Sequence, residues 1–474
     1  MRSASRWLVA SGFPSASASK EILNVKTQHI SQIGTTFRIG KGIAAGLGLM
    51  LASACTSILE VDNPNNVSAD ALDVPAAAPA ILAGAQNLAG NAMSSMLNFY
   101  TPATDEAYWV GSRDDYRLLD SGEFGIQTNE YVQSAYLVVA RARWMGDQAV
   151  TKLTKFNAAG VLRDKQLLVQ AYINAAALYT GIADKYDDIA FSDRTVAGAN
   201  YGETRMVALY DSATKWLDAA NALATGNNRA TVLALRARVK HSKAVWTKLN
   251  PAGTTPANPL VNDAGATADA QAALAARAGD WSFDIETSDL NEGDGSGGGF
   301  GFEMNSRVEY TTSQDLARID PNSGKPEAII AVDPVTGSVD STAVKQITRI
   351  VDAQNHPPMI QTSAREMRLI IAEAALAAGN NAGFDTEISA LRAIDRKAAY
   401  TGAGPSRVKL LEWERRVTLI FQGRRLNDMY RFGTKDAKWV ASALAVTKPG
   451  CLFPIPEIER KSNAKITGTA VCGK

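Results

Sequence analysis

The sequence contains very few of the residues that usually build active sites. Among its 474 residues are three histidines and three cysteines. Only His241 and His356 follow position 54, and more than a hundred residues separate them. The sequence has no H-E-x-x-H zinc motif and no G-x-S-x-G nucleophile motif. We therefore predict no catalysis, no cofactor and no metal.

An excess of charge of one sign is also missing. Lys and Arg total 49 against 48 Asp and Glu. Positions 1–54 hold six of the basic and one of the acidic residues, so residues 55–474 have 43 against 47, a formal charge of −4. Nucleic-acid binding would require a strongly basic surface, and we predict none.

One glycine-rich segment matches a dinucleotide-binding motif but lacks the secondary structure that should flank it. Residues 293–298 match G-x-G-x-x-G, yet no strand precedes them and no helix follows, which argues against a dinucleotide site. The surrounding segment 291–301 is acidic, but it lacks the regular ligand spacing of a calcium loop. We expect a flexible loop there.

The apolar run at residues 43–54 is too short to cross a membrane, which takes about 20 residues. It follows Arg38 and Lys41 and ends in small residues directly before Cys55, the arrangement of a secretory signal. The small residues before the cysteine resemble the bacterial lipoprotein processing box, which implies acylation of Cys55 and a lipid anchor. A structural cysteine after an ordinary signal is the alternative. Residues 1–37 resemble neither signal nor domain, and we expect a misassigned start codon.

Two further cysteines, Cys451 and Cys472, lie near the C-terminus. Disulfides persist in exported proteins, so we predict a bridge between them, with two free thiols as the alternative. Closing a loop of this length stabilises a protein by roughly 3 kcal/mol on the chain-entropy model.

Helical periodicity dominates the remaining sequence. We predict helices at residues 76–99, 129–154, 162–183, 204–223, 229–248, 363–378, 384–397 and 406–431. In the last of these, Glu412 and Arg416 are placed to pair at i,i+4. Alanine-rich helices joined by short polar turns indicate a mainly α fold of irregular tetratricopeptide-like helix pairs, although no clean 34-residue repeat is present.

Residues 250–361 have a different composition, rich in Pro, Gly, Thr, Asp and Asn. We predict a loop-rich insertion with a few short strands, among them the β-branched runs 328–332 and 347–351. Loops of this length within a domain are usually functional or disordered. The insertion is our predicted face for a ligand or partner.

Several motifs follow one another in the C-terminal third. They are Arg365 to Gly379 (REMRLIIAEAALAAG), Glu414-Arg415-Arg416, Phe421-Gln422-Gly423-Arg424-Arg425, Asp428, Arg431-Phe432-Gly433, and Leu452-Phe453-Pro454-Ile455-Pro456 with Glu459 and Asn463. Together they resemble the signatures of the SusD/RagB family of outer-membrane nutrient-binding lipoproteins. Leu59, Asp62, Asn63-Pro64-Asn65 and the turn Lys185-Tyr186-Asp187-Asp188-Ile189 extend the resemblance over most of residues 55–474.

The resemblance implies four tetratricopeptide-like helix pairs with a loop-rich face. It also implies a cell-surface location and a partner, a TonB-dependent (SusC-like) outer-membrane transporter. The ligand would be an oligosaccharide or a peptide. We expect Glu414, Arg425, Asp428 and Arg431 to form structural ion pairs around the last helix of the motif.

Exposed aromatic rings on loops are the expected sugar-binding residues, because sugar faces stack on rings and polar side chains bind the hydroxyl groups. Two regions meet this description. The candidates are Tyr108, Trp109, Arg113 and Tyr116 in the first, and Trp281, Phe300, Phe302, Arg307 and Tyr310 in the second. Ordinary core packing is the alternative for each ring, and it is the expectation for Trp144, Trp216, Trp246, Trp413 and Trp439.

Two other classes of protein remain open. A secreted glycan hydrolase needs two carboxyl groups about 5 to 10 Å apart in a cleft, and nothing in the sequence singles out such a pair. A helical-repeat scaffold would bind only other proteins and would bury its aromatic rings. Fold alone does not decide specificity, so the ligand is left open.

Overall fold

The structure is a computed structural model that describes residues 70–193, 196–288, 299–470 and 472. The predicted signal at 43–54, the predicted acylation site Cys55 and most of the glycine-rich loop at 291–301 lie outside these residues. Residues 67–474 form one compact unit by their contacts. No helix in the described part is both long enough and apolar enough to span a bilayer.

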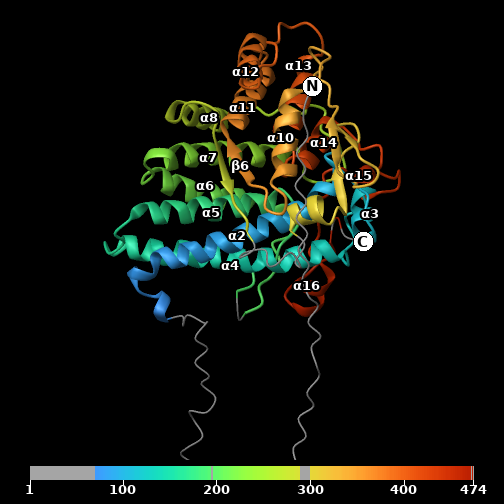
Figure 1. The fold of residues 1–474 in the computed structure, drawn as a ribbon. Coiled ribbons are helices and arrows are strands. Elements are labelled where there is room, and N and C mark those ends of the chain that lie inside the picture. The colour runs from blue at the N-terminus through green and yellow to red at the C-terminus, as the bar shows by residue number, and fades with distance from the viewer. Residues whose placement is uncertain (1–69, 194–195, 289–298, 471, 473–474) are drawn as a thin grey trace, which may run out of the picture. The chain divides into compact units, whose positions relative to one another are not determined.

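Eight long helices of the described chain pack as four consecutive pairs. The pairs are α2 (Ala78–Tyr100) with α4 (Glu130–Ala158), α5 (Lys165–Ala183) with α6 (Val207–Asn221), α7 (Gly226–Leu249) with α8 (Ala264–Ala276), and α11 (Ala364–Ala377) with α12 (Asn381–Ile394). Each pair also contacts the next, and Figure 1 shows the helices stacked from α4 to α12. The predicted mainly α fold of irregular helix pairs is confirmed.

Alanine allows these helices to approach closely. Ala175, Ala176 and Ala177 of α5 are at most 1% exposed, and α5 contacts α2, α4, α6 and α7. A helix that is apolar on all sides belongs in the interior. Polar N-caps begin several helices, such as Asn129, whose side chain accepts from the amides of Tyr131 and Val132.

Shorter elements cover one side of this helical stack. They include the helices α3 (Asp114–Asp120), α10 (Ser341–Asp352), α13 (Arg407–Thr418), α14 (Arg425–Phe432), α15 (Leu444–Thr447) and α16 (Glu457–Ser462). The strands form three antiparallel two-stranded ribbons: β1 (Ala107–Trp109) with β3 (Tyr310–Thr312), β2 (Ser282–Ile285) with β6 (Met359–Ser363), and β4 (Ala317–Ile319) with β5 (Pro326–Ile329).

The described part of the predicted insertion at 250–361 contains two α-helices of more than ten residues that we did not predict. Helix α8 is alanine-rich and begins at an Asp263 cap. Helix α10 includes residues 347–351, which we predicted as a strand. In α10, Ala343, Ile347 and Ile350 are buried at helical spacing. A five-residue segment with four β-branched residues is too short to distinguish the strand period from the helix period, and the whole of α10 has the helix period.

The helix predicted at 406–431 is also wrong, because it breaks between α13 and α14. Phe421 has φ 59° and Gly423 has φ 72°, both in the left-handed region, where a right-handed helix cannot continue. The expected Glu412 to Arg416 pair is absent. Arg416 instead contacts Asp315 at 2.8 Å and Asp105 at 3.3 Å.

The motif residues expected to form structural ion pairs do so. Glu414 contacts Lys397 at 2.9 Å, Arg425 contacts Asp105 at 2.6 Å, and Asp428 lies between Arg415 and Arg431 at 2.9 and 2.8 Å. All four predicted residues are at most 3% exposed. Their role in this structure is to join α13 and α14 to the helical stack.

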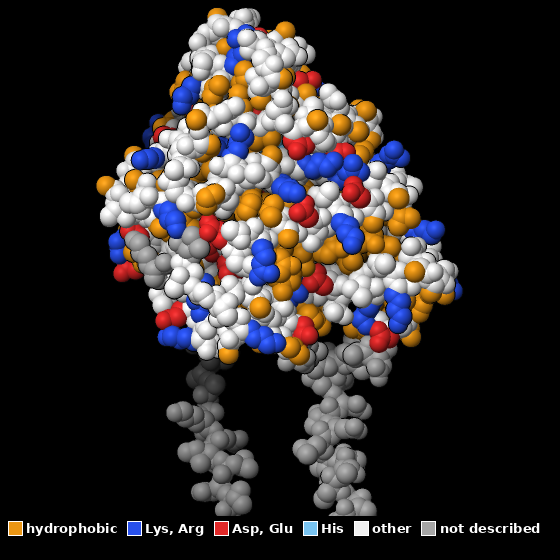
Figure 2. Space-filling view, turned by 180° about the vertical axis from the view of Figure 1, so that it is seen from behind, with side chains coloured by type: hydrophobic (Ala, Val, Ile, Leu, Met, Phe, Trp, Pro, Cys, Tyr) orange, Lys and Arg blue, Asp and Glu red, His pale blue; other side chains and the backbone are white. Residues whose placement is uncertain are grey.

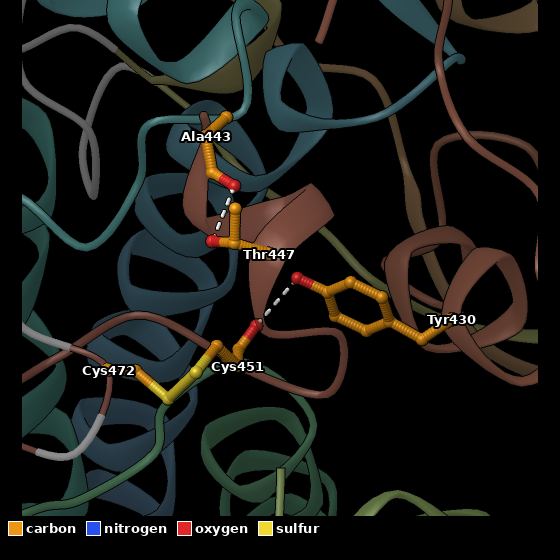
Figure 3. The surroundings of a disulfide bond; sticks show 5 residues. All are labelled: Tyr430, Ala443, Thr447, Cys451 and Cys472. Atoms are coloured by element: carbon orange, nitrogen blue, oxygen red, sulfur yellow. Dashed lines mark hydrogen bonds between the residues drawn. A yellow bond between two sulfur atoms is a disulfide. The ribbon is translucent and has the colours of Figure 1, made fainter. Parts of the chain in front are cut away.

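The C-terminal segment is attached by a disulfide between Cys451 and Cys472, both of which are buried. Figure 3 shows the carbonyl of Cys451 accepting a hydrogen bond from the Tyr430 hydroxyl at 2.8 Å. The disulfide therefore links the C-terminal segment to Cys451, which also accepts a hydrogen bond from Tyr430 of α14.

The five tryptophans expected to lie in helices differ in burial, and Trp439 lies in the turn segment between α14 and α15 rather than in a helix. Trp439 is 7% exposed, whereas Trp216, Trp246 and Trp413 are partly buried against the main core. Trp144 is also partly buried. The expectation that these rings pack inward holds best for Trp439.

Candidate ligand-binding groove

The two aromatic regions predicted from the sequence meet in the ribbon of β1 and β3. Tyr108 faces Thr311 and Trp109 faces Tyr310 in its antiparallel register. Residues about two hundred positions apart thus become neighbours. No local sequence pattern announces this pairing, since both strands are three residues long.

Glu309 fastens the end of β1 to the start of α3. Its carbonyl accepts from the amides of Val110 and Gly111, and its carboxylate accepts from the amides of Ser112 and Arg113 at 2.9 Å each. A Cβ on Gly111 would lie 2.6 Å from the Glu309 Cα, so only glycine allows this approach.

Below the ribbon, tyrosines form a buried cluster. Tyr116 and Tyr310 both donate to the side-chain oxygen of Asn98, at 2.8 and 2.9 Å, and neither ring is exposed. Tyr116 also stacks on Tyr131 with ring centroids 3.7 Å apart. These rings support the ribbon from inside.

The premise that all the candidate rings are exposed is therefore wrong for four of them. Besides Tyr116 and Tyr310, Phe300 is 1% exposed and Trp281 is 5% exposed. Trp281 also lies apart from the others, in a separate cluster with residues of α7, α8 and α11, and its indole donates to the Arg277 carbonyl. Apolar rings of this size are buried whenever neighbouring helices offer enough surface.

The remaining candidates are partly or fully exposed. Arg113 contacts Glu130 at 3.5 Å, and Arg307 contacts Glu303 at 3.3 Å and Glu309 at 3.5 Å. Phe302 is partly buried. Trp109 packs against the main core, and its indole nitrogen is buried without a hydrogen-bond partner among the described residues.

Tyr108 is a sequence candidate that lines an open groove of the described chain. This Tyr108 groove, of about 430 Å³, is bounded by β1, the loop after β3, α13 and the loop after α14. Its lining consists of Asp105, Tyr108, Ser313, Gln314, Asp315, Arg416, Thr434, Lys435, Asp436, Ala437 and Lys438.

Charged side chains of both signs surround the Tyr108 ring. Lys438 Nζ lies 5.8 Å from the ring centroid and contacts Asp120 at 2.7 Å and Asp436 at 3.2 Å. On the other side, Arg416 contacts Asp315, whose side chain is 57% exposed. The groove thus offers a ring face, cationic donors and carboxylate acceptors, the combination that binds a hydroxyl-rich or mixed-charge ligand.

Asp105 is the buried anchor of the groove. Burial raises the pKa of its carboxyl, but Arg425 and Arg416 outweigh that effect and lower it to about 2. The carboxylate therefore stays charged near neutral pH and keeps Arg416 in place through the 3.3 Å contact. Ion pairs of this kind position donors at the groove.

The sequence reading missed most of this groove. Arg416, Lys435 and Lys438 come from α13 and from the segment after α14, and nothing local connects them with Tyr108. The short polar run after Gly433 was the only signal available. Within the described residues, no group of three or more His, Cys, Asp or Glu could hold a metal ion.

The surface seen in Figure 2 carries Lys and Arg interspersed with Asp and Glu. Charges of one sign do not gather into a broad region on that face. This distribution agrees with the nearly neutral composition.

No protein-family model and no curated protein matches the sequence, but solved structures match the fold. A SusD superfamily protein from Bacteroides fragilis superposes with a TM-score of 0.59 at 14% identity, over 83% of this chain and 99% of that one. A SusD homologue from Bacteroides thetaiotaomicron gives 0.57 at 13% identity, over 84% and 97%. A laminarin-binding SusD-like protein gives 0.50 at 13% identity, over 83% and 98%.

These likenesses span nearly the full length of each neighbour. The chain has the SusD-like fold.

Proposed function

We propose that this protein is a cell-surface lipoprotein of the outer membrane that binds an oligomeric nutrient, most simply a glycan, and passes it to a TonB-dependent transporter. The observation that carries the proposal is a SusD-like fold with an aromatic, charged groove built by loops on one side of the helical stack. A structural neighbour that binds laminarin supports a glycan as the ligand class. The protein binds its ligand and does not cleave it.

The Tyr108 groove is the proposed binding site. Its volume lies within the range of about 300 to 1,000 Å³ found for small-ligand sites. Arg416, Lys435 and Lys438 provide donors, while Asp315 and Asp436 provide acceptors. The predicted insertion contributes Ser313 to Asp315, in agreement with its proposed role as a ligand face.

A glycan and peptide array on the purified full chain in detergent tests the ligand class, followed by titration calorimetry with the tightest ligand. Tyr108→Ala is expected to weaken binding at least tenfold, whereas Tyr108→Phe keeps the ring and most of the affinity. An unchanged affinity in Tyr108→Ala would remove this groove as the site. Release of sugar from the ligand by the protein alone would contradict the binding role.

The anchor and the partner need separate tests. Mass spectrometry of membrane-purified protein is expected to find acyl chains on Cys55, and Cys55→Ala should move the protein out of the membrane fraction. Native purification should recover a transporter barrel. Recovery of unacylated protein from the cytosol would overturn the proposed location.

A further inference from the structure

A second groove lies on the helical stack and shares no lining residue with the Tyr108 groove. It runs between α2, α5, the start of α7 and strand β2, and has a volume of about 440 Å³. Figure 1 shows α2 and α5 side by side at this level of the stack, where the two helices are in contact. We call it the amide groove, because its walls carry Gln86, Asn87, Gln170, Asn174 and Asn228.

Most of these amides are available to a ligand. The side chains of Gln86, Asn87 and Gln170 form no hydrogen bond with any other described residue. Asn174 is 4% exposed and donates to the Ala85 carbonyl at 3.3 Å, which fixes its orientation at the base of the groove. Gln170 and Asn174 are four residues apart and so share one face of α5.

Strand β2 and the residue after it add an aromatic ring, Phe283, and two carboxylates, Asp284 and Glu286, to this groove. The register of β2 with β6 shifts between Phe283 and Asp284. The extra residue of this bulge is Gln361 on β6, which has no opposite residue on β2.

Asp284 has an unsatisfied acceptor beside the groove. Its Oδ1 is buried and has no hydrogen-bond partner within the described chain. Its Oδ2 lies 3.9 Å from the Arg349 guanidinium, beyond hydrogen-bond distance. A buried polar atom without a partner is costly, and a donor from a ligand would satisfy it.

The lining of the amide groove contains no Lys or Arg. In this it differs from the Tyr108 groove, which has Arg416, Lys435 and Lys438. An anionic ligand would meet the carboxylates of Asp284 and Glu286, and the cation beside them, Arg349, is not part of the lining. Neutral amides, carboxylate acceptors and a partly buried ring instead suit uncharged hydroxyl groups around an apolar sugar face.

We propose that the amide groove is a second binding site, specific for a neutral oligosaccharide. This inference rests on the proposed glycan-binding function and adds to it a site and a substrate class. Two grooves of different charge would let the protein hold a branched or long glycan at two points, or glycans of two kinds.

Calorimetry with a panel of neutral hexasaccharides, including laminarihexaose and maltohexaose, tests the proposal on the full chain in detergent. The double variant Asn87→Ala/Gln170→Ala should weaken binding about tenfold, the effect of losing one or two hydrogen bonds. The matched control Gln148→Ala/Asn157→Ala changes the same residue types on α4, outside both grooves. It should bind like the wild type.

Hydrogen exchange of the unmodified protein gives a readout that does not depend on variant stability. A bound hexasaccharide should protect peptides covering 86–87, 170–174 and 283–284. Protection confined to residues 105–116 and 433–438 would overturn the amide groove and leave the Tyr108 site standing. Equal affinity of the double variant and the wild type would also overturn it.

The remaining outcomes separate the two proposals. Binding of an acidic oligosaccharide or a peptide that depends on Tyr108, with no neutral sugar bound, would retain nutrient binding and reject the amide groove. Failure to bind any glycan or peptide would reject both. Loss of neutral-sugar binding in the double variant, with Tyr108→Ala unaffected, would support the amide groove and reject the Tyr108 site.

Discussion

Glu106 is a buried carboxyl group beside the Asp105 anchor. It is 1% exposed, and its Oε1 accepts from the Phe421 amide at 2.9 Å, while its Oε2 has no partner among the described residues. Burial raises the pKa of Glu106 to about 8, and neighbouring Asp105 adds to the effect. At neutral pH the folded protein therefore keeps a proton on Glu106 that the unfolded chain has lost.

This proton predicts a pH-dependent stability. The folded state binds one more proton than the unfolded state between about pH 4.5 and 8, so the free energy of unfolding falls as the pH rises through that window. Glu106→Gln keeps an acceptor for Phe421 and cannot ionise. Its stability relative to the wild type should rise by on the order of 4 kcal/mol between pH 5 and 9.

Urea unfolding at pH 5, 7 and 9 measures this difference. Glu327→Gln removes an exposed carboxylate and is the control, since its side chain is 54% exposed. Parallel pH profiles for Glu106→Gln and the wild type would show that Glu106 ionises normally in the folded state.

Arg431 is the centre of a second buried charge network. It is fully buried and pairs with Glu373 and, at 2.8 Å, with Asp428. Burial raises the pKa of Glu373, but Arg431 and His241 outweigh this and hold it well below its usual value. Removing the cation would leave a carboxylate buried with fewer partners.

Arg431→Met should therefore destabilise the protein by about 3 to 5 kcal/mol. The matched control is Arg318→Met, which breaks the exposed pair with Glu327 and should cost at most about 1 kcal/mol. Chemical unfolding at pH 7 compares the two. Similar losses for both variants would contradict the structural role assigned to the motif arginine.

At the level of elements, the Tyr108 groove depends on how β1 turns into α3. Gly111 and Glu309 approach closely in that turn, and the Glu309 carboxylate binds the two amides that begin the next segment. The turn fixes the direction in which β1 leaves the core. The position of Tyr108 follows from that direction.

Gly111→Ala should disturb this connection. A Cβ would lie 2.6 Å from a backbone atom of Glu309, so the strands must separate. We expect a loss of about 1 to 3 kcal/mol and weaker binding at the Tyr108 groove, measured by thermal unfolding and calorimetry. Gly146→Ala, where a Cβ would meet no atom within 4 Å and the backbone is not left-handed, is the matched control. Equal effects would mean that close approach is unimportant.

At the scale of the whole molecule, the disulfide joins the end of the chain to the segment that follows α15. Cys451 and Cys472 are separated by 21 residues, and the loop between them includes α16. Gly125, before α4, lies against the Cys472 carbonyl. The disulfide therefore holds the tail near the helical stack.

Replacing both cysteines by serine should lower the free energy of unfolding by about 3 kcal/mol, because the unfolded chain regains the freedom of that loop. Unfolding of the wild type with and without reductant provides the comparison. The double variant should be insensitive to reductant. A stability equal to that of the wild type would show that packing alone holds the tail.

Patterns among residues that are close together in the sequence allowed much of the fold to be predicted. Seven of the eight long helices were predictable because their apolar residues recur at helical spacing. Helix α8 was missed because it is built of alanine and polar residues and has no such apolar face. Helix α10 was missed because the β-branched segment within it is too short to show a helical period. The break near Phe421 was missed because a left-handed residue other than glycine has no clear sequence signal. The cysteine pair was predictable because just two cysteines follow the predicted acylation site.

By itself, the sequence determined most of the paired helices and the motifs of the SusD-like fold, since each depends on residues close together in the chain, and its composition determined the near-neutral charge. Only the tertiary structure decided which aromatic rings are exposed. Burial depends on which distant elements pack together. In this chain β1 pairs with β3, Tyr108 lies beside Lys438, and Tyr116 and Tyr310 are enclosed in the core. The groove that joins Phe283 and Asp284 of β2 to amides of α2 and α5 is equally a property of the tertiary structure.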